Sequence, residues 1–401
     1  MNYSQTLAWL FKRLPVYQRV GAPAMRLGLD QMNRLSTALG NPHRSLKCIH
    51  IAGTNGKCST AHMLASVLQT AGYTVGLYTS PHLKDFRERI KINGQPIDKD
   101  IVVDFVNENL KTLETGNYSF FEATVGMAFS SFSKARVDVA IIEVGLGGRL
   151  DATNIITPIL SIITHISKDH QQFLGNTIEA IAAEKAGIIK ENVPVVIGQN
   201  KESVQNVILD KAKSLPSPVF FANQTETYST DLLGDYQKEN LATAMMALKV
   251  LTEFDINENH IREGLQAVVK NTGFQGRWQV IADSPTVIAD VAHNEAGIGA
   301  VMNQLQSMTY DHAHIVFGMV EDKDYNQIHK QLPKDATYYF CSPKVVRAKA
   351  VDQLFTEANR LGYNGKTYES VSDALDAAKK MASPSDIILV CGSLFVVAEV
   401  I

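Results

Sequence analysis

The segment from Gly53 to Thr60 combines two glycines, a lysine and three hydroxyl residues within eight positions. Glycine adopts backbone angles that other residues avoid, which suits a tight loop around an anion. At the start of a following helix, backbone N–H groups and the positive end of the helix dipole favour phosphate. Lys57 adds a charge that can reach the outer phosphates of a nucleotide. We therefore predict phosphate binding by this segment, which consists of Gly53, Thr54, Asn55, Gly56, Lys57, Cys58, Ser59 and Thr60.

The strict P-loop pattern G-x-x-x-x-G-K-[ST] is not met in this segment. Ile51 stands where that pattern requires glycine, and Cys58 follows the lysine in place of a hydroxyl residue. An ordinary strand-to-helix turn with a surface lysine is the alternative interpretation. Phosphate binding is favoured because an apolar strand, two glycines, a lysine and a helix coincide.

Three further polar residues lie near the ends of predicted elements. Glu143 closes an apolar strand and precedes a glycine-rich loop, a position where a carboxylate can hold the Mg²⁺ of a nucleotide. A strand-end charge that faces solvent is the alternative. His170 also follows a strand, although a lone histidine is more often structural and Mg²⁺ prefers oxygen ligands. Lys185 lies near a helix end, where a solvated cation would interact favourably with the helix C-terminus.

Strands and helices alternate around these residues, and a β-α-β order implies parallel pairing. The stretch 1–48 is predicted to form amphipathic helices that are too short for a separate domain, and the charged stretch 84–93 a surface loop or hairpin. Apolar runs predict strands at 47–52, 74–79, 138–144, 159–166, 194–198 and within 215–222, and helical spacing predicts helices at 61–71, 101–113, 123–133, 177–185 and 235–251.

A second alternation begins after a predicted hinge at Phe274-Gln275-Gly276, with strands at 286–290, 313–318, 336–341 and 386–391. Strands that alternate with helices indicate an independent α/β domain. The predicted fold is therefore α/β. A P-loop-type, mainly parallel sheet with helices on both faces occupies 1–274, and a smaller Rossmann-like α/β domain occupies 277–401.

Composition narrows the class of protein. The 401 residues suffice for two or three domains, and 45% hydrophobic with 20% charged residues is typical of a soluble globular protein. A net charge of −3 does not indicate nucleic acid or an anionic membrane as a partner. Four cysteines without C-x-x-C spacing indicate neither a disulfide framework nor a zinc site. Since no apolar run approaches the ~20 residues of a membrane helix and no signal peptide is evident, a cytoplasmic location is predicted.

Gly53-Thr54-Asn55-Gly56-Lys57 followed by a serine resembles the variant loop of the Mur ligase superfamily, and specifically that of folylpolyglutamate synthase/dihydrofolate synthase. The family usually has glycine at Cys58. Its D-G-A-H-N-P motif corresponds to Asp290–Glu295, with Val291 in place of glycine and Glu295 in place of proline. The resemblance spans almost the full chain, and further matches are Gly318 with Asp322-Lys323-Asp324, and Gly392-Ser393-Leu394.

The resemblance implies roles for individual residues. It implies ATP contacts for Asn240, Arg277 and Asp290 besides the glycine segment, and Mg²⁺ ligands at Ser80, Glu143 and His170. Lys185 matches a lysine that can be carbamylated and can then hold a second Mg²⁺. The implied catalytic residues are Lys57, Lys185 and His293. The implied substrate contacts are Phe121, next to Phe120, and Leu150, Asp151, Ala152, His293 and Ser393.

The activity implied by the resemblance is an ATP-dependent amide ligase that adds L-glutamate to dihydropteroate, to folates or to both. Transfer of the γ-phosphoryl group would turn a carboxylate into an acyl phosphate, which the amine of glutamate attacks. One domain would hold ATP and pterin and the other would bring glutamate, in a chain expected to be a monomer. A cell-wall Mur ligase is disfavoured because only 47 residues precede Cys48. A folylpolyglutamate synthase without the second activity, or a catalytically degenerate nucleotide-binding protein, stays open.

Asp151 has two interpretations. A carboxylate beside this loop can accept two N–H bonds from the edge of a reduced pterin, and charge-assisted bonds of this kind are strong. Alternatively, Asp151 makes an Asx-type turn contact with the N–H groups of Thr153 or Asn154.

Overall fold

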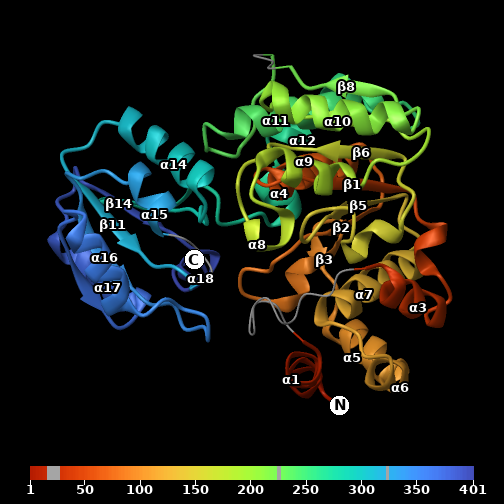
Figure 1. The fold of residues 1–401 in the computed structure, drawn as a ribbon, viewed down its shortest axis with the longest axis horizontal. Coiled ribbons are helices and arrows are strands. Elements are labelled where there is room, and N and C mark those ends of the chain that lie inside the picture. Colours follow the sequence, from red (N-terminus) through yellow and green to blue (C-terminus); the bar gives the residue numbers. More distant parts are fainter. Residues whose placement is uncertain (16–27, 224–226, 322–324) are drawn as a thin grey trace. The chain divides into compact units, whose positions relative to one another are not determined.

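The computed structural model describes residues 1–15, 28–223, 227–321 and 325–401. Among these residues the chain forms two compact units (Figure 1). Unit 1 runs to Phe274 without Leu232–Tyr236, and unit 2 contains Leu232–Tyr236 and Gln275–Ile401. Part of the predicted helical stretch 1–48, residues 16–27, and the match at Asp322-Lys323-Asp324 lie outside the described residues.

Unit 1 is built on an eight-stranded sheet with the order β4-β3-β2-β5-β1-β6-β7-β8. The strands from β2 to β8 in that order pair in parallel, whereas β3 and β4 pair antiparallel at one edge. The central strands are apolar and buried because both faces are covered. The strands are β1 (Cys48–Ala52), β2 (Val75–Tyr78), β3 (Ile90–Ile92), β4 (Gln95–Pro96), β5 (Val139–Glu143), β6 (Leu160–Ile163), β7 (Val195–Ile197) and β8 (Val219–Phe221).

Helices cover both faces of this sheet, which confirms the predicted fold class. On one face, Phe129 and Phe132 join an apolar cluster with Tyr78, Ala140 and Ile142. On the other face, α4 packs against β1, β2 and β5, and α11 packs against β6 and β7. The helices are α1 (Tyr3–Arg13), α3 (Asp30–Ala38), α4 (Lys57–Thr70), α5 (Lys99–Glu108), α6 (Leu110–Thr115), α7 (Phe120–Ala135), α8 (Gln171–Leu174), α9 (Ile178–Ala186), α10 (Glu202–Ser214), α11 (Gln237–Val250), α12 (Glu258–Leu265) and α13 (Val268–Thr272), with 3-10 turns η2 (Pro42–Ser45), η3 (Phe86–Arg89) and η4 (Ala152–Ile155).

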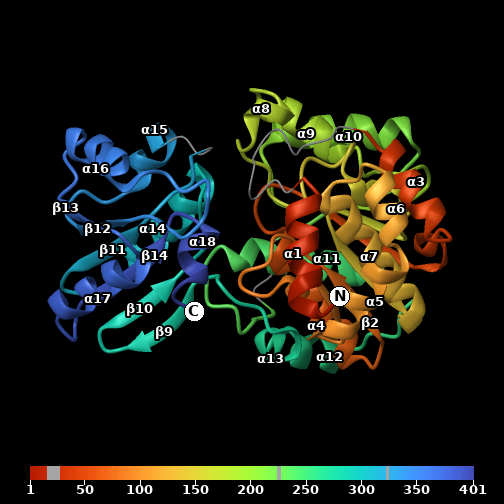
Figure 2. The same cartoon turned by 90° about the horizontal axis from the view of Figure 1, so that it is seen from below.

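Unit 2 contains a six-stranded sheet with the order β13-β12-β11-β14-β10-β9. Its strands pair in parallel except for β9, which forms an antiparallel hairpin with β10 at the edge (Figure 2). The elements are β9 (Gln279–Asp283), β10 (Thr286–Ala289), α14 (Glu295–Ser307), β11 (Ala313–Phe317), α15 (Tyr325–Ile328), η5 (His329–Gln331), β12 (Thr337–Cys341), α16 (Val351–Arg360), β13 (Gly365–Tyr368), α17 (Val371–Met381), β14 (Ile387–Cys391) and α18 (Leu394–Ala398).

Two details differ from the predictions. The stretch 84–93, predicted as a surface loop or hairpin, forms η3 and β3, and β3 pairs with β4 beyond it, but Arg89 and Lys91 are 3% and 5% exposed instead of lying on the surface. Their charged groups have buried polar partners, since Arg89 Nε donates to His82 Nδ1 at 2.8 Å and Lys91 Nζ donates to the Thr272 carbonyl at 2.7 Å. The predictions do not include strands β9 and β13, because both are edge strands that are only partly buried and have no apolar run of four or more residues.

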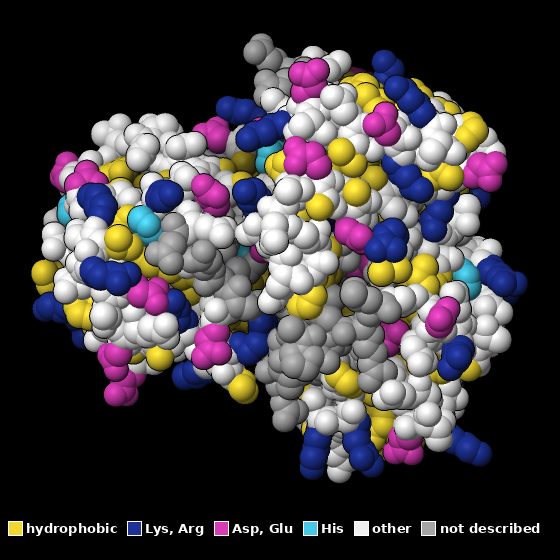
Figure 3. Space-filling model, in the orientation of Figure 1, with side chains coloured by type: hydrophobic (Ala, Val, Ile, Leu, Met, Phe, Trp, Pro, Cys, Tyr) yellow, Lys and Arg dark blue, Asp and Glu magenta, His cyan; other side chains and the backbone are white. Residues whose placement is uncertain are grey.

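The surface carries mixed charge. On the face of unit 1 that Figure 3 presents, basic and acidic side chains are interspersed. None of the helices in the described ranges combines the length and the apolar character that a bilayer-spanning segment requires.

Candidate active site

The glycine loop (Gly53–Lys57) connects β1 to α4 and requires both of its glycines. Gly53 has a φ of +151° and Gly56 a φ of +89°, which residues with a Cβ rarely adopt. A Cβ at Gly53 would lie 1.9 Å from Thr164 Oγ1, and a Cβ at Gly56 would lie 2.1 Å from Asn240 Oδ1. The loop is therefore enclosed by Thr164 beyond β6 and by Asn240 on α11, the residue predicted to contact ATP.

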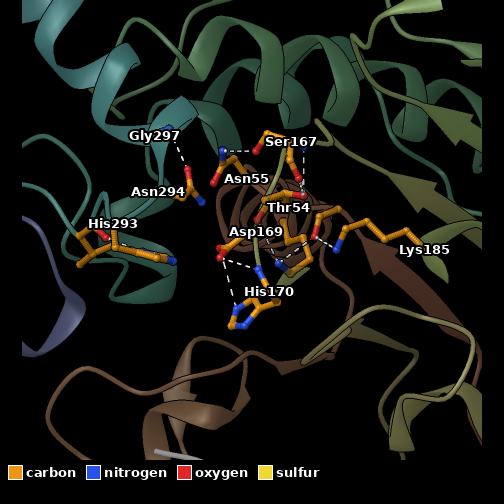
Figure 4. A network of polar contacts seen from close by, with 12 residues as sticks. Thr54, Asn55, Ser167, Asp169, His170, Lys185, His293, Asn294 and Gly297 are labelled. Carbon is orange, nitrogen blue, oxygen red and sulfur yellow. Dashed lines mark hydrogen bonds and ion pairs between the residues drawn. The ribbon is translucent and has the colours of Figure 1, made fainter. Parts of the chain in front are cut away.

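Hydrogen bonds to residues 165–167 fix the conformation of the glycine loop (Figure 4). The N–H groups of Thr54 and Asn55 donate to the His165 carbonyl at 2.8 and 3.2 Å. Thr54 Oγ1 donates to the Ser167 carbonyl at 3.0 Å, and Asn55 Nδ2 donates to Ser167 Oγ at 3.3 Å. The predicted site segment and the loop before His170 are thus one hydrogen-bonded structure.

Helix α4 begins at Lys57 and presents its N-terminus at this loop. The first backbone bond of the helix runs from the Thr60 N–H to the Gly56 carbonyl at 2.9 Å. The N–H groups of Lys57, Cys58 and Ser59 precede this bond, at the positions where helices bind anions. Cys58 is the second helical residue, so its side chain does not disturb the glycine conformations.

Two buried polar atoms near the glycine loop, Thr60 Oγ1 and Gln237 Nε2, lack a hydrogen-bond partner among the described residues. Gln237 Oε1 accepts a bond of 2.8 Å from Asn240 Nδ2, and Asn240 is the residue that packs on Gly56. Buried polar groups are normally paired, so these two atoms favour a ligand with polar atoms at this end of α4. The loop, its helix and these side chains fit a nucleotide.

Two lysines converge on one carbonyl group of the loop. Lys57 Nζ donates to the carbonyls of Gly53 and Thr54 at 3.1 and 3.3 Å, and Lys185 Nζ donates to the Gly53 carbonyl at 2.8 Å. Lys185 is 4% exposed. Burial lowers the pKa of Lys185 to about 7, and the positive charge of Lys57 acts in the same direction. Lys185 is therefore a buried amine, not the solvated cation of the alternative interpretation.

The predicted metal ligands lie on elements that adjoin the glycine loop. Glu143 ends β5 with 3% exposure, its Oε2 accepts the Ser80 N–H at 3.1 Å, and its Oε1 lies 4.0 Å from Lys57 Nζ. His170 has a φ of +50°, and its N–H donates to Asp169 Oδ1 at 2.8 Å. A hydroxyl, a carboxylate and an imidazole are compatible with Mg²⁺ that keeps water or phosphate oxygens as further ligands. Among the described residues, no group of three or more His, Cys, Asp or Glu side chains could hold a metal.

The loop after β5 buries Asp151, which is 6% exposed. Its Oδ1 accepts the Thr153 N–H at 3.0 Å and the Thr153 hydroxyl at 2.5 Å, while Oδ2 accepts the Leu146 N–H at 2.8 Å. Burial raises the pKa of Asp151, and the Thr153 hydroxyl opposes this effect. The Asx-type turn contact with Thr153 is present. Leu150 and Ala152 flank Asp151, half-buried and buried respectively.

The two phenylalanines that start α7 have different surroundings. Helix α7 begins with a capping box in which Ser119 and Glu122 exchange hydrogen bonds, and this fixes the two rings. Phe120 is buried and stacks on Phe11 at a centroid distance of 4.9 Å. Phe121 is half-buried, and its ring lies where a Cβ on Gly145 would be 2.4 Å from Cζ. Phe121 therefore belongs with the Gly145–Asp151 loop, and Phe120 belongs to the core.

In unit 2, the loop after β10 carries Asp290, which is 2% exposed. Its carboxylate accepts the Trp278 N–H at 2.7 Å, the Ala292 N–H at 2.8 Å and the Tyr236 hydroxyl. Burial raises the pKa of Asp290, and the charge of Arg277 opposes this effect. Arg277 is half-buried, and its guanidinium donates to the Gly276 carbonyl at 3.2 Å.

His293 and Ser393 also lie in unit 2. His293 Nδ1 lies 2.9 Å from the Val291 carbonyl (Figure 4). A carbonyl oxygen can only accept a hydrogen bond, so Nδ1 carries a proton. Ser393 is 3% exposed and caps α18, since its Oγ accepts the Phe395 N–H at 3.2 Å. Its predicted contact with substrate stays a prediction.

Sequence reasoning missed several residues of this site. Gln237 lies within the stretch 234–240 that indicated Asn240, so its buried amide could have been considered. Thr164 and His165 contact the glycine loop from the segment after β6, and no sequence spacing signals such a contact. Asp169 directly precedes His170. Burial lowers the pKa of Lys185, and the negative charge of Asp169 opposes this effect.

Comparison with known proteins places this geometry in a family. Residues 51–232 match the Mur ligase middle domain, and residues 276–394 match the Mur ligase glutamate ligase domain. The Bacillus subtilis dihydrofolate synthase/folylpolyglutamate synthase is 33% identical over 99% of this chain and 98% of its own length. The probable bifunctional folylpolyglutamate synthase/dihydropteroate synthase of Haloferax volcanii is 35% identical over the whole chain, which spans 50% of that protein.

Solved structures agree with these matches. Escherichia coli FolC in complex with DHPP and ADP has a TM-score of 0.89 and 30% identity, and the match covers 100% of this chain and 97% of that one. A bifunctional folylpolyglutamate synthase/dihydrofolate synthase with Mn, AMPPNP and L-glutamate bound has a TM-score of 0.84 and 30% identity over the same shares. The chain therefore belongs to the folylpolyglutamate synthase/dihydrofolate synthase family of the Mur ligases.

Proposed function

We propose that the protein is an ATP-dependent ligase that joins L-glutamate to dihydropteroate and to folates through an acyl phosphate. The observation that carries the proposal is the glycine loop, where Lys57 and Lys185 both donate to the Gly53 carbonyl and Lys57 lies 4.0 Å from Glu143. Cationic and metal-binding groups beside a phosphate loop are the parts that phosphoryl transfer requires.

The chemistry assigns separate tasks to these residues. A free carboxylate is a poor acyl donor because its leaving group would be oxide, so it must be phosphorylated first. Lys57 is positioned to stabilise the charge on the transferred group, with the α4 N-terminus and the glycine loop as phosphate donors. We assign Asn240, Arg277 and Asp290 to nucleotide contacts, and His293 to the substrate or the phosphate. Water must be excluded because it would hydrolyse the acyl phosphate.

We assign Mg²⁺ to Ser80, Glu143 and His170, and the bound ion would offset charge on the ATP phosphates. Lys185 supports a second role. Only a neutral amine reacts with CO₂, and burial lowers the pKa of Lys185 to about 7, so a large fraction is neutral at physiological pH. Carbamylated Lys185 would be an anion, in place of a second cation next to Lys57, and it could hold a second Mg²⁺.

The pterin end of the substrate is assigned to the Gly145–Asp151 loop. Phe121 offers a half-exposed ring for stacking, and Asp151 Oδ2 offers an acceptor, with Leu150 and Ala152 beside it. Relatives whose names include both activities, and a FolC structure with DHPP bound, favour dihydropteroate as well as folate. The glutamate end is assigned to unit 2, including Ser393, by its match to the glutamate ligase domain.

We further propose that the enzyme is a monomer and that it is cytoplasmic. Four free cysteines agree with the reducing conditions of the cytoplasm. The test of the proposed function is ATP turnover by the purified chain. ADP and phosphate should form only when Mg²⁺, L-glutamate and dihydropteroate or a folate are all present, and Lys57→Ala should abolish turnover while circular dichroism stays unchanged. Turnover that ignores the pterin, or wild-type turnover by Lys57→Ala, would contradict the proposal, and use of folates alone would restrict it to a folylpolyglutamate synthase.

A further inference from the structure

His50 lies in the middle of β1, the central strand, and its side chain is completely buried. Its Nε2 lies 2.9 Å from Thr153 Oγ1, and Thr153 Oγ1 lies 2.5 Å from Asp151 Oδ1. A chain of hydrogen bonds therefore runs from the core of the sheet to the carboxylate assigned to the pterin. None of the reaction steps uses His50.

The chemistry of the three groups fixes the direction of this chain. An ionised Asp151 only accepts hydrogen bonds, so the Thr153 hydroxyl must donate its one proton to Oδ1. The same hydroxyl must then accept from His50 Nε2–H. His50 Nδ1 is buried without a partner among the described residues, which suits an unprotonated nitrogen. Burial lowers the pKa of His50 to about 3, with a smaller contribution from Lys190, so the ring stays neutral at any working pH.

In this arrangement the two oxygens of Asp151 accept hydrogen bonds from different donors. Oδ1 accepts both the N–H and the hydroxyl of Thr153, which uses its two acceptor positions. Oδ2 accepts the Leu146 N–H, and the Gly145 N–H is a further backbone donor to this carboxylate. Because Thr153 uses both acceptor positions of Oδ1, a ligand donor can meet this carboxylate only at Oδ2.

The backbone of the loop has supports that do not involve His50. Asn154 Nδ2 donates to the carbonyls of Arg149 and Gly187 at 3.0 and 3.1 Å, and Lys190 Nζ donates to the Asn154 carbonyl at 3.0 Å. Loss of the His50 hydrogen bond should leave the loop in place and free the Thr153 hydroxyl and the carboxylate to rotate.

We propose that His50 is a positioning residue for substrate recognition, which acts through Thr153 to keep Asp151 Oδ2 turned toward the pterin edge of the substrate. The proposal rests on the pterin site assigned above. It predicts that His50 affects the binding of dihydropteroate and leaves ATP binding and the chemical step unchanged.

The test compares variants that keep or remove each donor. His50→Leu and Thr153→Val remove the hydrogen bond, whereas His50→Gln and Thr153→Ser retain a donor in a similar position. In the first pair we expect KM for dihydropteroate to rise about tenfold, with kcat and KM for ATP unchanged. In the second pair we expect KM for dihydropteroate to return most of the way to the wild-type value. Equal effects on KM for ATP, or no recovery in the second pair, would overturn the proposal.

A matched control is Ser161→Ala. Ser161 is fully buried, lies beside His50 in register on β6, and donates to the Ile188 carbonyl at 3.1 Å. Its loss removes a buried hydrogen bond of the same sheet that does not lead to Asp151. KM for dihydropteroate should stay unchanged in this variant. A rise equal to that in His50→Leu would show that any buried polar deletion has this effect, which would refute a specific role for His50.

A double-variant cycle separates positioning from structural support. With Asp151→Asn as background, His50→Leu should raise KM no further, since the carboxylate that it positions is absent. Additive effects would refute the proposal. Binding of dihydropteroate, measured by pterin fluorescence, gives the same comparison without turnover. A wild type that binds dihydropteroate but does not convert it would therefore disprove the synthase activity and leave the proposal for His50 intact. If His50→Leu does not fold, Thr153→Val takes its place in the cycle.

Discussion

The loop after β1 in unit 1 and the loop after β10 in unit 2 both follow a buried parallel strand and both lead into a helix, but their backbones are constrained differently. Gly53 and Gly56 have positive φ, and a Cβ on either would clash with a buried side chain. Val291, which replaces a family glycine, has a φ below zero, as the β-branched side chain requires. It is 3% exposed and packs without backbone strain.

The difference explains which departures from the family pattern are tolerated. In unit 1, neighbouring side chains approach the loop so closely that they leave no room for a Cβ, and the departure falls at Cys58, inside the helix. In unit 2, Asp290 and Asn294 stabilise the loop through their own side chains, which accept the N–H groups of Trp278, Ala292 and Gly297. A glycine is therefore indispensable only where the backbone, and not a side chain, forms the binding surface.

The largest effect is expected for Gly56→Ala. The alanine would require φ near +89° and would meet Asn240 Oδ1, so the loop or the Asn240 side chain must shift. A displacement of this kind should reduce turnover by about a hundredfold. Gly72→Ala is the control, because Gly72 has a φ of +91° with nothing within 4 Å of its Cβ. It should cost about 1–2 kcal/mol of stability and keep turnover. Equal turnover of the two variants would contradict the steric argument.

Glu143→Gln should come next. The variant keeps the size of the side chain and its hydrogen bond to the Ser80 N–H, but it loses the charge proposed to hold Mg²⁺. The Mg²⁺ concentration for half-maximal turnover should rise about 10–100-fold. Asp290→Asn makes the comparison with unit 2, since it should weaken ATP binding at saturating Mg²⁺ and leave the Mg²⁺ titration unchanged. Identical magnesium titrations for the wild type and Glu143→Gln would rule out direct coordination.

Lys185 should make stability depend on pH. Its pKa is about 7 in the folded chain and 10.5 in the unfolded reference, so the unfolded chain binds the extra proton between these values. The contribution of Lys185 to stability should therefore rise as pH increases from about 7 to 10.5 and stay constant below 7. Denaturant titrations of the wild type and Lys185→Met should diverge across that window. Parallel curves would indicate that the folded lysine keeps the ordinary pKa of a lysine.

Sequence patterns predicted what depends on local order. The apolar run at 138–144 and the helical spacing at 177–185 correspond to β5 and α9, because burial in a parallel sheet leaves a strong pattern. Patterns could not predict that Lys91 is buried, because its partner Thr272 is distant in the chain. For Asp151, the turn contact with Thr153 is one of the two interpretations of the sequence. Patterns could not predict the link from Thr153 to His50, because it depends on how β1 and η4 pack.

Alkylation of Cys58 probes the start of helix α4 in unit 1 without a substitution. Its thiol lies on the second residue of α4, one position from Lys57, and is half-buried, whereas Cys48, Cys341 and Cys391 are buried. Alkylation should therefore occur first at Cys58 and should slow about tenfold or more when ATP is saturating, since ligand binding blocks access. The three buried cysteines provide the reference within the same sample. Equal rates with and without ATP would place the thiol away from the nucleotide.

The smallest effect is expected in unit 2, for Glu295→Pro, which restores the family residue. Glu295 is the exposed first residue of α14, and proline is favoured at that position because its missing N–H has no partner inside the helix. The residue before a proline must be extended, and Asn294 already has φ −125° and ψ 166°. The Asn294 side chain accepts the Gly297 N–H at 2.9 Å, which does not involve residue 295. Stability should change by less than about 0.5 kcal/mol, because the lost helix-dipole interaction of the glutamate and the gain from proline are both small. Thermal unfolding and steady-state turnover measure this, and a loss of turnover above threefold would mean that Glu295 itself contributes to the reaction, so that unit 2 would hold a specialised site where the family has only a helix start.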